Sequence, residues 1–348
     1  MPSNNTIIWE MMTPQVMKQL LPLNEAQQKM IEWARIRIEK IFSWESDRKI
    51  LIIWPCSIDY EESFFEYGEF IKKINEQVKD KIEIILRFYP GKPRTIGWWK
   101  GLAYSAPGEK ANMWNGIYGV RSMALRALEL WFPLADEMLN PHLVEYVDDY
   151  LSYIAIWARS TENQYHREVS SGLDVPVGFK NPTSWDIEIM TNSIKAWQTS
   201  SHYILGNTVR DSLGNPLSHW ILRWWYVTWP NYWEKFIKEY MNYADSIKNP
   251  SLIIDASHDN CRIDANTKDP FRQIDIVRGI LADIIPSLTA KWIDAKKAVK
   301  WFMVESYIYD GNQKYVDEEH VLRWKSLTDP CIWLEKTEKL ILEMHKNI

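Results

Sequence analysis

Four residues that could ligate a metal ion are spread through the chain, three of them just after short apolar runs. Cysteine, histidine and carboxylate side chains together offer sulfur, nitrogen and oxygen donors. That mixture suits Mn, Fe, Co or Zn better than Ca or Mg. Each residue also has an ordinary reading, such as a buried thiol, a loop histidine or a cap before a proline turn. The four residues are Cys56, His258, Glu305 and Asp329.

A set of cationic residues also follows the apolar runs. The formal net charge is -5, so an anion would have to be recognised by local clusters of Lys and Arg rather than by a global basic field. Arg offers a bidentate fork for phosphate or carboxylate. Two clusters around one metal predict two phosphorylated substrates. The first cluster is Arg87, Arg159, Lys180 and Arg223; the second is Lys92, Arg94 and Thr95; and the carboxylate Glu137 lies near the end of the apolar run Pro133–Met138.

The elements that must position these residues alternate between apolar runs and longer amphipathic stretches such as 63–80, 116–130 and 183–199. This alternation predicts a parallel sheet covered on both faces. Eight such units favour an α/β fold, a (β/α)8 TIM barrel over residues 49–348, in which the carboxyl ends of the strands share one face. An open doubly wound sheet is the alternative, weakened because no GxGxxG follows the first run. The runs are Leu51–Pro55, Ile82–Phe88, Pro133–Met138, Tyr153–Ala158, Val175–Phe179, Tyr203–Leu205, Leu252–Ala256 and Val299–Val304.

Two segments lie outside the repeating units. Residues 1–48 read as an N-terminal extension, in which Asn24 caps a helix that runs to about Phe42. Gly206–Pro216 carries the turn signal Leu213-Gly214-Asn215-Pro216, so we expect an inserted β-hairpin after strand six, within residues 206–222.

Composition limits the class of protein. The 348 residues include only three cysteines, which are too few for a disulfide framework and, being odd in number, cannot all pair. This cysteine content favours a reducing cytoplasm. No apolar run reaches 18 residues, so we expect no membrane span. The net charge of -5 gives no global basic field, so we expect no nucleic-acid partner.

Several segments, in order, resemble the motifs of type I 3-deoxy-D-arabino-heptulosonate 7-phosphate (DAHP) synthases. The resemblance runs from about residue 15 to the C-terminus. The extension and the inserted hairpin resemble the feedback-regulated branch. The segments are Pro55-Cys56-Ser57-Ile58, Lys92-Pro93-Arg94-Thr95, Trp99-Lys100-Gly101-Leu102, Ala158-Arg159-Ser160-Thr161-Glu162, Pro176-Val177-Gly178-Phe179-Lys180-Asn181, Ser257-His258, Val304-Glu305-Ser306 and Ser326-Leu327-Thr328-Asp329-Pro330-Cys331.

The resemblance implies a transferase that condenses phosphoenolpyruvate with erythrose 4-phosphate and water, the first step of the shikimate pathway. It implies one divalent metal on Cys56, His258, Glu305 and Asp329. It places phosphoenolpyruvate on Arg87, Arg159, Lys180 and Arg223, and erythrose 4-phosphate on Lys92, Arg94 and Thr95. The implied catalytic residues are Lys92, Glu137, Lys180, His258 and Asp329.

Two alternatives stay open. A 3-deoxy-D-manno-octulosonate 8-phosphate synthase shares the phosphoenolpyruvate chemistry but takes a five-carbon sugar phosphate. A non-catalytic barrel could instead bind aromatic amino acids. By analogy with the regulated branch we expect an aromatic amino-acid inhibitor and a homodimer or homotetramer, with residues 1–48 serving assembly or regulation.

Tryptophan is abnormally frequent, with 20 residues against only 13 glycines. An ordinary chain has roughly 7% glycine. Tryptophan stands where the resembling family has glycine, and indole overpacks such sites. Because some genetic codes read UGA as glycine and others as tryptophan, we interpret many of these positions as glycine codons; a repurposed paralogue is the alternative. The positions are Trp54, Trp98, Trp157, Trp185, Trp224, Trp225, Trp301, Trp324 and Trp333.

Overall fold

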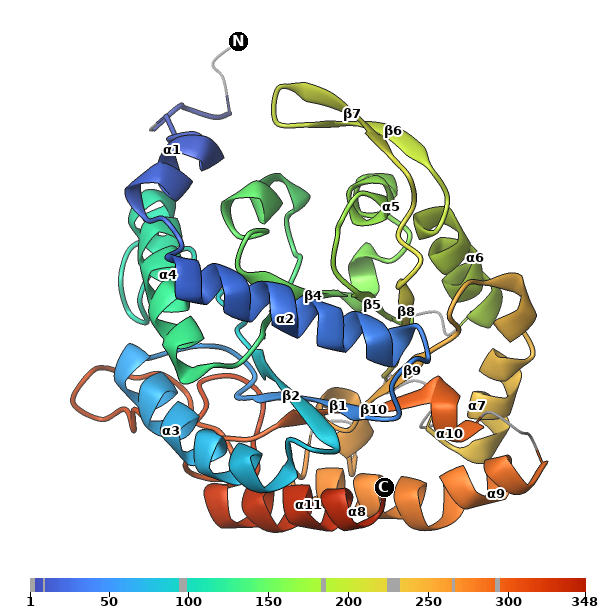
Figure 1. Ribbon diagram of the computed structural model, residues 1–348. Coiled ribbons are helices and arrows are strands. Elements are labelled where there is room, and N and C mark those ends of the chain that lie inside the picture. The colour runs from blue at the N-terminus through green and yellow to red at the C-terminus, as the bar shows by residue number, and fades with distance from the viewer. Residues whose placement is uncertain are drawn as a thin grey trace.

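The computed structural model describes residues 4–8, 10–93, 99–182, 186–223, 232–264, 267–291 and 295–348. Its fold is a closed barrel of eight parallel strands (Figure 1). The order around the barrel is β1-β10-β9-β8-β5-β4-β3-β2, so the first and last strands pair and close it. The predicted (β/α)8 barrel is therefore confirmed. Its strands are β1 (Lys49–Trp54), β2 (Ile82–Arg87), β3 (Leu134–Glu137), β4 (Leu151–Ile156), β5 (Val177–Lys180), β8 (His219–Leu222), β9 (Leu252–Asp255) and β10 (Val299–Glu305).

Helices surround the barrel, as Figure 1 shows. Their apolar faces pack on the outer side of the strands and form one large core cluster with them. None of the described helices is both long enough and apolar enough to cross a membrane. The helices are α1 (Pro14–Leu20), α2 (Glu25–Phe42), α3 (Glu61–Val78), α4 (Met113–Ala127), α5 (Gln164–Ser171), α6 (Ile187–Trp197), α7 (Glu234–Met241), α8 (Arg272–Gly279), α9 (Ile285–Lys291), α10 (Ala295–Ala298) and α11 (Leu334–Lys346).

The extension closes the amino-terminal end of the barrel. Helix α2 begins as predicted, because Asn24 and Gln27 form a reciprocal capping box. Its last turns place Ile38 and Phe42 in a cluster with residues inside the barrel. The Phe42 ring stacks on His219, with ring centroids 4.1 Å apart. The opposite end, where the carboxyl ends of the strands meet, is left for a functional site.

The position predicted for the inserted hairpin was wrong. Strands β6 (Ser201–Leu205) and β7 (Thr208–Ser212) pair antiparallel in a separate two-stranded sheet. The hairpin thus precedes the sixth barrel strand, β8, and the run Tyr203–Leu205 belongs to the hairpin. The physical reason is exposure: His202 and Ile204 face solvent, whereas all four residues of β8 are buried.

Three tryptophans adopt a backbone conformation that L-residues with a Cβ rarely take. The φ angles are +70° at Trp44, +65° at Trp131 and +127° at Trp301. Among the residues that the structure describes, only two other non-glycine residues, Asn249 and His258, have positive φ. At Trp301 the register of β10 against β9 also shifts.

Candidate active site and metal centre

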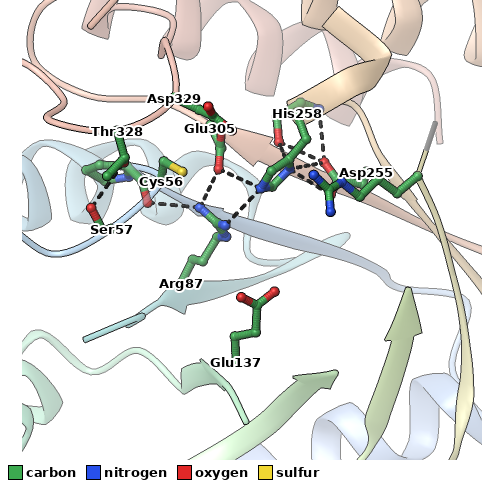
Figure 2. A network of polar contacts seen from close by, with 12 residues as sticks. Cys56, Ser57, Arg87, Glu137, Asp255, His258, Glu305, Thr328 and Asp329 are labelled. Atoms are coloured by element: carbon green, nitrogen blue, oxygen red, sulfur yellow. Dashed lines mark hydrogen bonds and ion pairs between the residues drawn. The ribbon is translucent and has the colours of Figure 1, made fainter. Parts of the chain in front are cut away.

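Four potential metal ligands meet at the carboxyl end of the barrel. Cys56 follows β1, Glu305 ends β10, His258 follows β9 and Asp329 lies in the loop before α11 (Figure 2). One ligand atom from each lies within 4.8 Å of the others. The closed barrel brings the ends of its first and last strands together, which is how residues some 270 positions apart come to share one site.

His258 is held by a carboxylate on its far side. Its Nδ1 donates a hydrogen bond to Oδ1 of Asp255, 3.0 Å away, and Oδ2 of the same carboxylate at the end of β9 lies 2.8 Å from Nδ1. This contact fixes Nδ1 as the protonated nitrogen and aims Nε2 at the other ligands. Burial opposes protonation of His258, but Asp255 and then Glu305 outweigh it and raise the pKa of the imidazole.

Cys56 lies against an ammonium group. Nζ of Lys92 is 2.7 Å from Sγ of Cys56. Burial and the nearby Glu305 act to raise the pKa of the thiol, while Lys92 and a hydrogen bond with His258 act to lower it. The net shift is downward. A thiolate is the form that ligates metals, so the site favours the ligating state of Cys56.

The buried carboxylate of Glu305 has an oxygen that could bind a cation. The carboxylate is fully buried, and its Oε1 lies 2.7 Å from Nη1 of Arg87 and 3.2 Å from Nε2 of His258. No donor among the described residues forms a hydrogen bond with its buried Oε2. A buried carboxylate oxygen without a donor is costly, and a bound cation would relieve that cost. The donor set and its geometry therefore fit a divalent transition metal.

A pocket of about 270 Å³ opens beside these ligands. Most of its wall is charged, and nearly all of the described residues assigned above to substrates face it. Arg87 and Glu305 lie beneath, linked to it through His258. Arg94 and Thr95, assigned to erythrose 4-phosphate, lie outside the described residues. The wall contains Cys56, Lys92, Glu137, Trp157, Arg159, Lys180, Arg223, His258, Asp259, Arg262, Lys268 and Asp329.

Glu137 and Lys180 form a buried ion pair in this wall, with Oε1 and Nζ 2.6 Å apart. Burial opposes ionisation of Glu137, but Lys180 and Lys92 outweigh it and lower its pKa to about 2. Glu137 is therefore an anion throughout the physiological range, able to accept a hydrogen bond from water but not to donate a proton.

Trp157 narrows the pocket beside a predicted substrate cation. Cζ of Arg159 lies 4.7 Å from the centroid of the Trp157 ring, within the range of a cation–π contact. An indole here occupies space in front of a guanidinium that the resemblance assigns to phosphoenolpyruvate.

Sequence reasoning missed four charged residues of the site. Asp255 could have been found, because it is a carboxylate inside a buried strand three residues before His258. Asp259 lies in the short 3-10 helix His258–Cys261, and Arg262 and Lys268 pair in an isolated bridge after it; no spacing rule predicts which of these side chains turn inward.

Comparison with known proteins identifies a family that covers most of the chain. Residues 25–342 match the model of the DAHP synthetase I family. A Trp-sensitive phospho-2-dehydro-3-deoxyheptonate aldolase of Enterobacter agglomerans is 33% identical, over 96% of this chain and 94% of its own. The Tyr-sensitive enzyme of Escherichia coli K12 is 31% identical, over 97% and 93%. The solved structure of a phospho-2-dehydro-3-deoxyheptonate aldolase from Francisella tularensis superposes with a TM-score of 0.89 at 27% identity, over 99% and 98% of the two chains. The chain belongs to the DAHP synthetase I family.

Proposed function

We propose that this chain condenses phosphoenolpyruvate with D-erythrose 4-phosphate and water, giving DAHP and inorganic phosphate, in the pocket beside Cys56, His258, Glu305 and Asp329. The observation that carries the proposal is the convergence of four ligating atoms within 4.8 Å, at the edge of a pocket lined by cations. In this reaction C3 of phosphoenolpyruvate bonds to the aldehyde carbon, water adds at C2, and the C2–O bond to phosphate breaks.

The cations of the wall hold the two anions together. Arg159, Lys180 and Arg223 surround the space for phosphoenolpyruvate, and Arg87 lies behind it. Lys92, next to Cys56, lies between the two substrates. Fixed positive charges offset the repulsion between two phosphorylated molecules and hold them at reacting distance.

When bound, a divalent metal supplies Lewis-acid polarisation of the aldehyde oxygen. Cys56, His258, Glu305 and Asp329 would hold it, and Asp255 would keep His258 oriented. Mn, Fe, Co and Zn all suit this donor set. Glu137, which forms an ion pair with Lys180, would orient the water that adds at C2.

The test is loss of phosphoenolpyruvate, followed with and without erythrose 4-phosphate, after EDTA treatment and again after Mn²⁺ is returned. We expect loss that depends on both the sugar phosphate and the metal. Lys180→Met should abolish this loss of phosphoenolpyruvate. Lys79→Met should leave it unchanged; Lys79 is exposed and forms an ion pair with Glu76 of the same length, 2.6 Å, as that between Lys180 and Glu137. Faster loss with arabinose 5-phosphate would favour the octulosonate synthase instead. No loss by folded, metal-loaded protein would favour the non-catalytic barrel.

Regulation and assembly extend the same proposal. The relatives named Trp-sensitive and Tyr-sensitive suggest that an aromatic amino acid inhibits this chain as well. The β6–β7 hairpin and α1 lie on the same side of the barrel in Figure 1 and leave apolar side chains exposed, among them Ile204, Val209 and Val16. These segments suit a subunit contact in a homodimer or homotetramer. Sedimentation tests the assembly, and the phosphoenolpyruvate assay with added tryptophan, tyrosine or phenylalanine tests the inhibition.

A further inference from the structure

Lys268 contacts one predicted metal ligand directly. Its Nζ lies 3.0 Å from Oδ2 of Asp329 and 3.7 Å from Oδ1 of Asp259. The ammonium group of Lys268 therefore lies between two carboxylates at the edge of the metal site.

Asp259 connects this lysine to the substrate pocket. The carboxylate is buried, with its Oδ1 2.7 Å from Nε of Arg262 and its Oδ2 3.7 Å from Nη2 of Arg223. A chain of charged contacts thus runs from Arg223 through Asp259 and Lys268 to Asp329. One end of the chain belongs to the anion pocket and the other to the metal site.

We propose that Lys268 is a positioning residue whose ammonium group is shared between Asp329 and Asp259 and links metal binding to anion binding. Without metal, the ammonium group neutralises Asp329. A divalent cation bound to Asp329 repels it, and Asp259 retains it at the pocket wall. Metal on Asp329 would therefore free the charge of Lys268 from Asp329, and the wall that receives phosphoenolpyruvate would become more positive. The inference rests on the proposed function, since it assumes a metal on Asp329.

This arrangement predicts opposite effects on the two ligands when the charge is removed. In Lys268→Met, Mn²⁺ should bind about tenfold more tightly, because a cation beside its ligand is gone. Phosphoenolpyruvate should bind severalfold more weakly, and Mn²⁺ should enhance its binding less. A merely structural role would weaken both ligands together. Lys268→Arg keeps the charge and should behave like the parent protein.

The experiment is calorimetric titration of the metal-free protein with Mn²⁺ alone, then with phosphoenolpyruvate with and without Mn²⁺. Lys79→Met serves as the matched control, because its lysine is also paired with a carboxylate but lies on the outer surface. If the parent protein binds no Mn²⁺, the proposed function fails. If it binds Mn²⁺ and Lys268→Met binds it equally or more weakly, only the role of Lys268 is overturned.

A second inference comes independently from the backbone. Three of the five non-glycine residues with positive φ in the described part of the chain are tryptophans. The end of α2 shows why this matters. The N–H of Glu45 donates to the carbonyl of Lys40, and the N–H of Trp44 donates to that of Ile41. This is the Schellman motif, and Trp44 occupies its left-handed position, which usually belongs to glycine.

The geometry assigns glycine to positions 44, 131 and 301 in the functional protein. Trp131 likewise ends the helical turn after α4 in the left-handed conformation. Trp301 lies inside β10 at a φ that a Cβ disfavours. A reading of UGA as glycine in the source cell accounts for all three, and it adds positions 44 and 131 to those suspected from the sequence.

A matched pair of exposed tryptophans tests the assignment. Trp33 and Trp131 are both 56% exposed, but Trp33 lies inside helix α2. Trp131→Gly should raise the thermal midpoint by about 2 °C, because it relieves left-handed strain. Trp33→Gly should lower the midpoint, because glycine disfavours a helix interior. A fall in both variants, or UGG codons at all three positions, would overturn the inference.

Discussion

Oδ2 of Asp255 lies 2.8 Å from Nδ1 of His258, so a carboxylate at the end of β9 orients a predicted metal ligand from outside the ligand set. The contact is buried on both sides, and Ser257 also donates to Asp255. Such contacts fix the tautomer of a ligating histidine and are worth roughly 10- to 100-fold in metal affinity.

Asp255→Asn should therefore weaken Mn²⁺ binding by about 10- to 100-fold while the barrel stays folded. Calorimetric titration of the metal-free protein gives the affinity, and circular dichroism checks the fold. Asp264→Asn, in the exposed part of the following loop, is the control. Unchanged Mn²⁺ affinity in Asp255→Asn would mean that His258 does not ligate the metal through Nε2.

Peroxide should inactivate the enzyme through Cys56. The pKa of Cys56 is lowered, whereas burial, Glu305 and Cys56 itself raise the pKa of the neighbouring thiol Cys331 well above its usual range. Cys56 is thus the more readily oxidised thiol, and we expect its sulfenic acid to condense with the Cys331 thiol to a disulfide, with peroxide reduced to water. In Cys331→Ser we expect dithiothreitol to restore less activity than in the parent. Equal recovery in both would exclude the disulfide; Cys261→Ser is the control.

Trp157→Gly should improve binding of phosphoenolpyruvate. Its ring holds the Arg159 guanidinium at 4.7 Å and fills part of the pocket wall. Release of a contact worth about 1 kcal/mol should lower the KM for phosphoenolpyruvate severalfold. Trp157→Phe keeps a smaller ring and should give an intermediate KM. A higher KM in Trp157→Gly, with kcat unchanged, would instead make the indole part of the binding surface.

Stability should rise with pH because of a lysine far from the site. Burial, with help from the charge on Lys49, lowers the pKa of Lys300 to about 7. The unfolded chain has a lysine pKa of about 10.4, so between pH 7 and 9 it binds more protons than the folded chain. This group therefore adds stability as pH rises, by up to about 1.4 kcal/mol per pH unit.

Removal of that lysine isolates its contribution. Lys300→Met should be more stable than the parent at pH 7, and the difference should shrink by pH 9. Urea unfolding at pH 7, 8 and 9 measures it, and the exposed variant Lys79→Met should show no such trend. A stability difference that stays constant with pH would show that Lys300 is charged in the folded protein at pH 7.

The alternation of apolar runs and amphipathic stretches was enough to predict the barrel. Seven of its eight strands overlap the predicted runs, because a strand buried on both faces is mostly apolar along its length. The same rule failed at Tyr203–Leu205, where a short apolar run lies in an exposed hairpin. The sixth barrel strand is His219–Leu222, which follows the hairpin in the chain. The histidine at its start interrupts the apolar pattern that predicted the other strands.

For the site, the sequence by itself determined the residues that follow the strands, because the carboxyl ends of parallel strands must meet on one face. Cys56, His258 and Glu305 could be named on that ground. Only the tertiary structure decided that Lys268 contacts Asp329 and Asp259, and that Asp259 in turn contacts Arg223. Those contacts join segments that follow three different strands, β8, β9 and β10. No local periodicity predicts which side chains of such segments turn inward. Their positions depend on how the closed barrel brings the loops together.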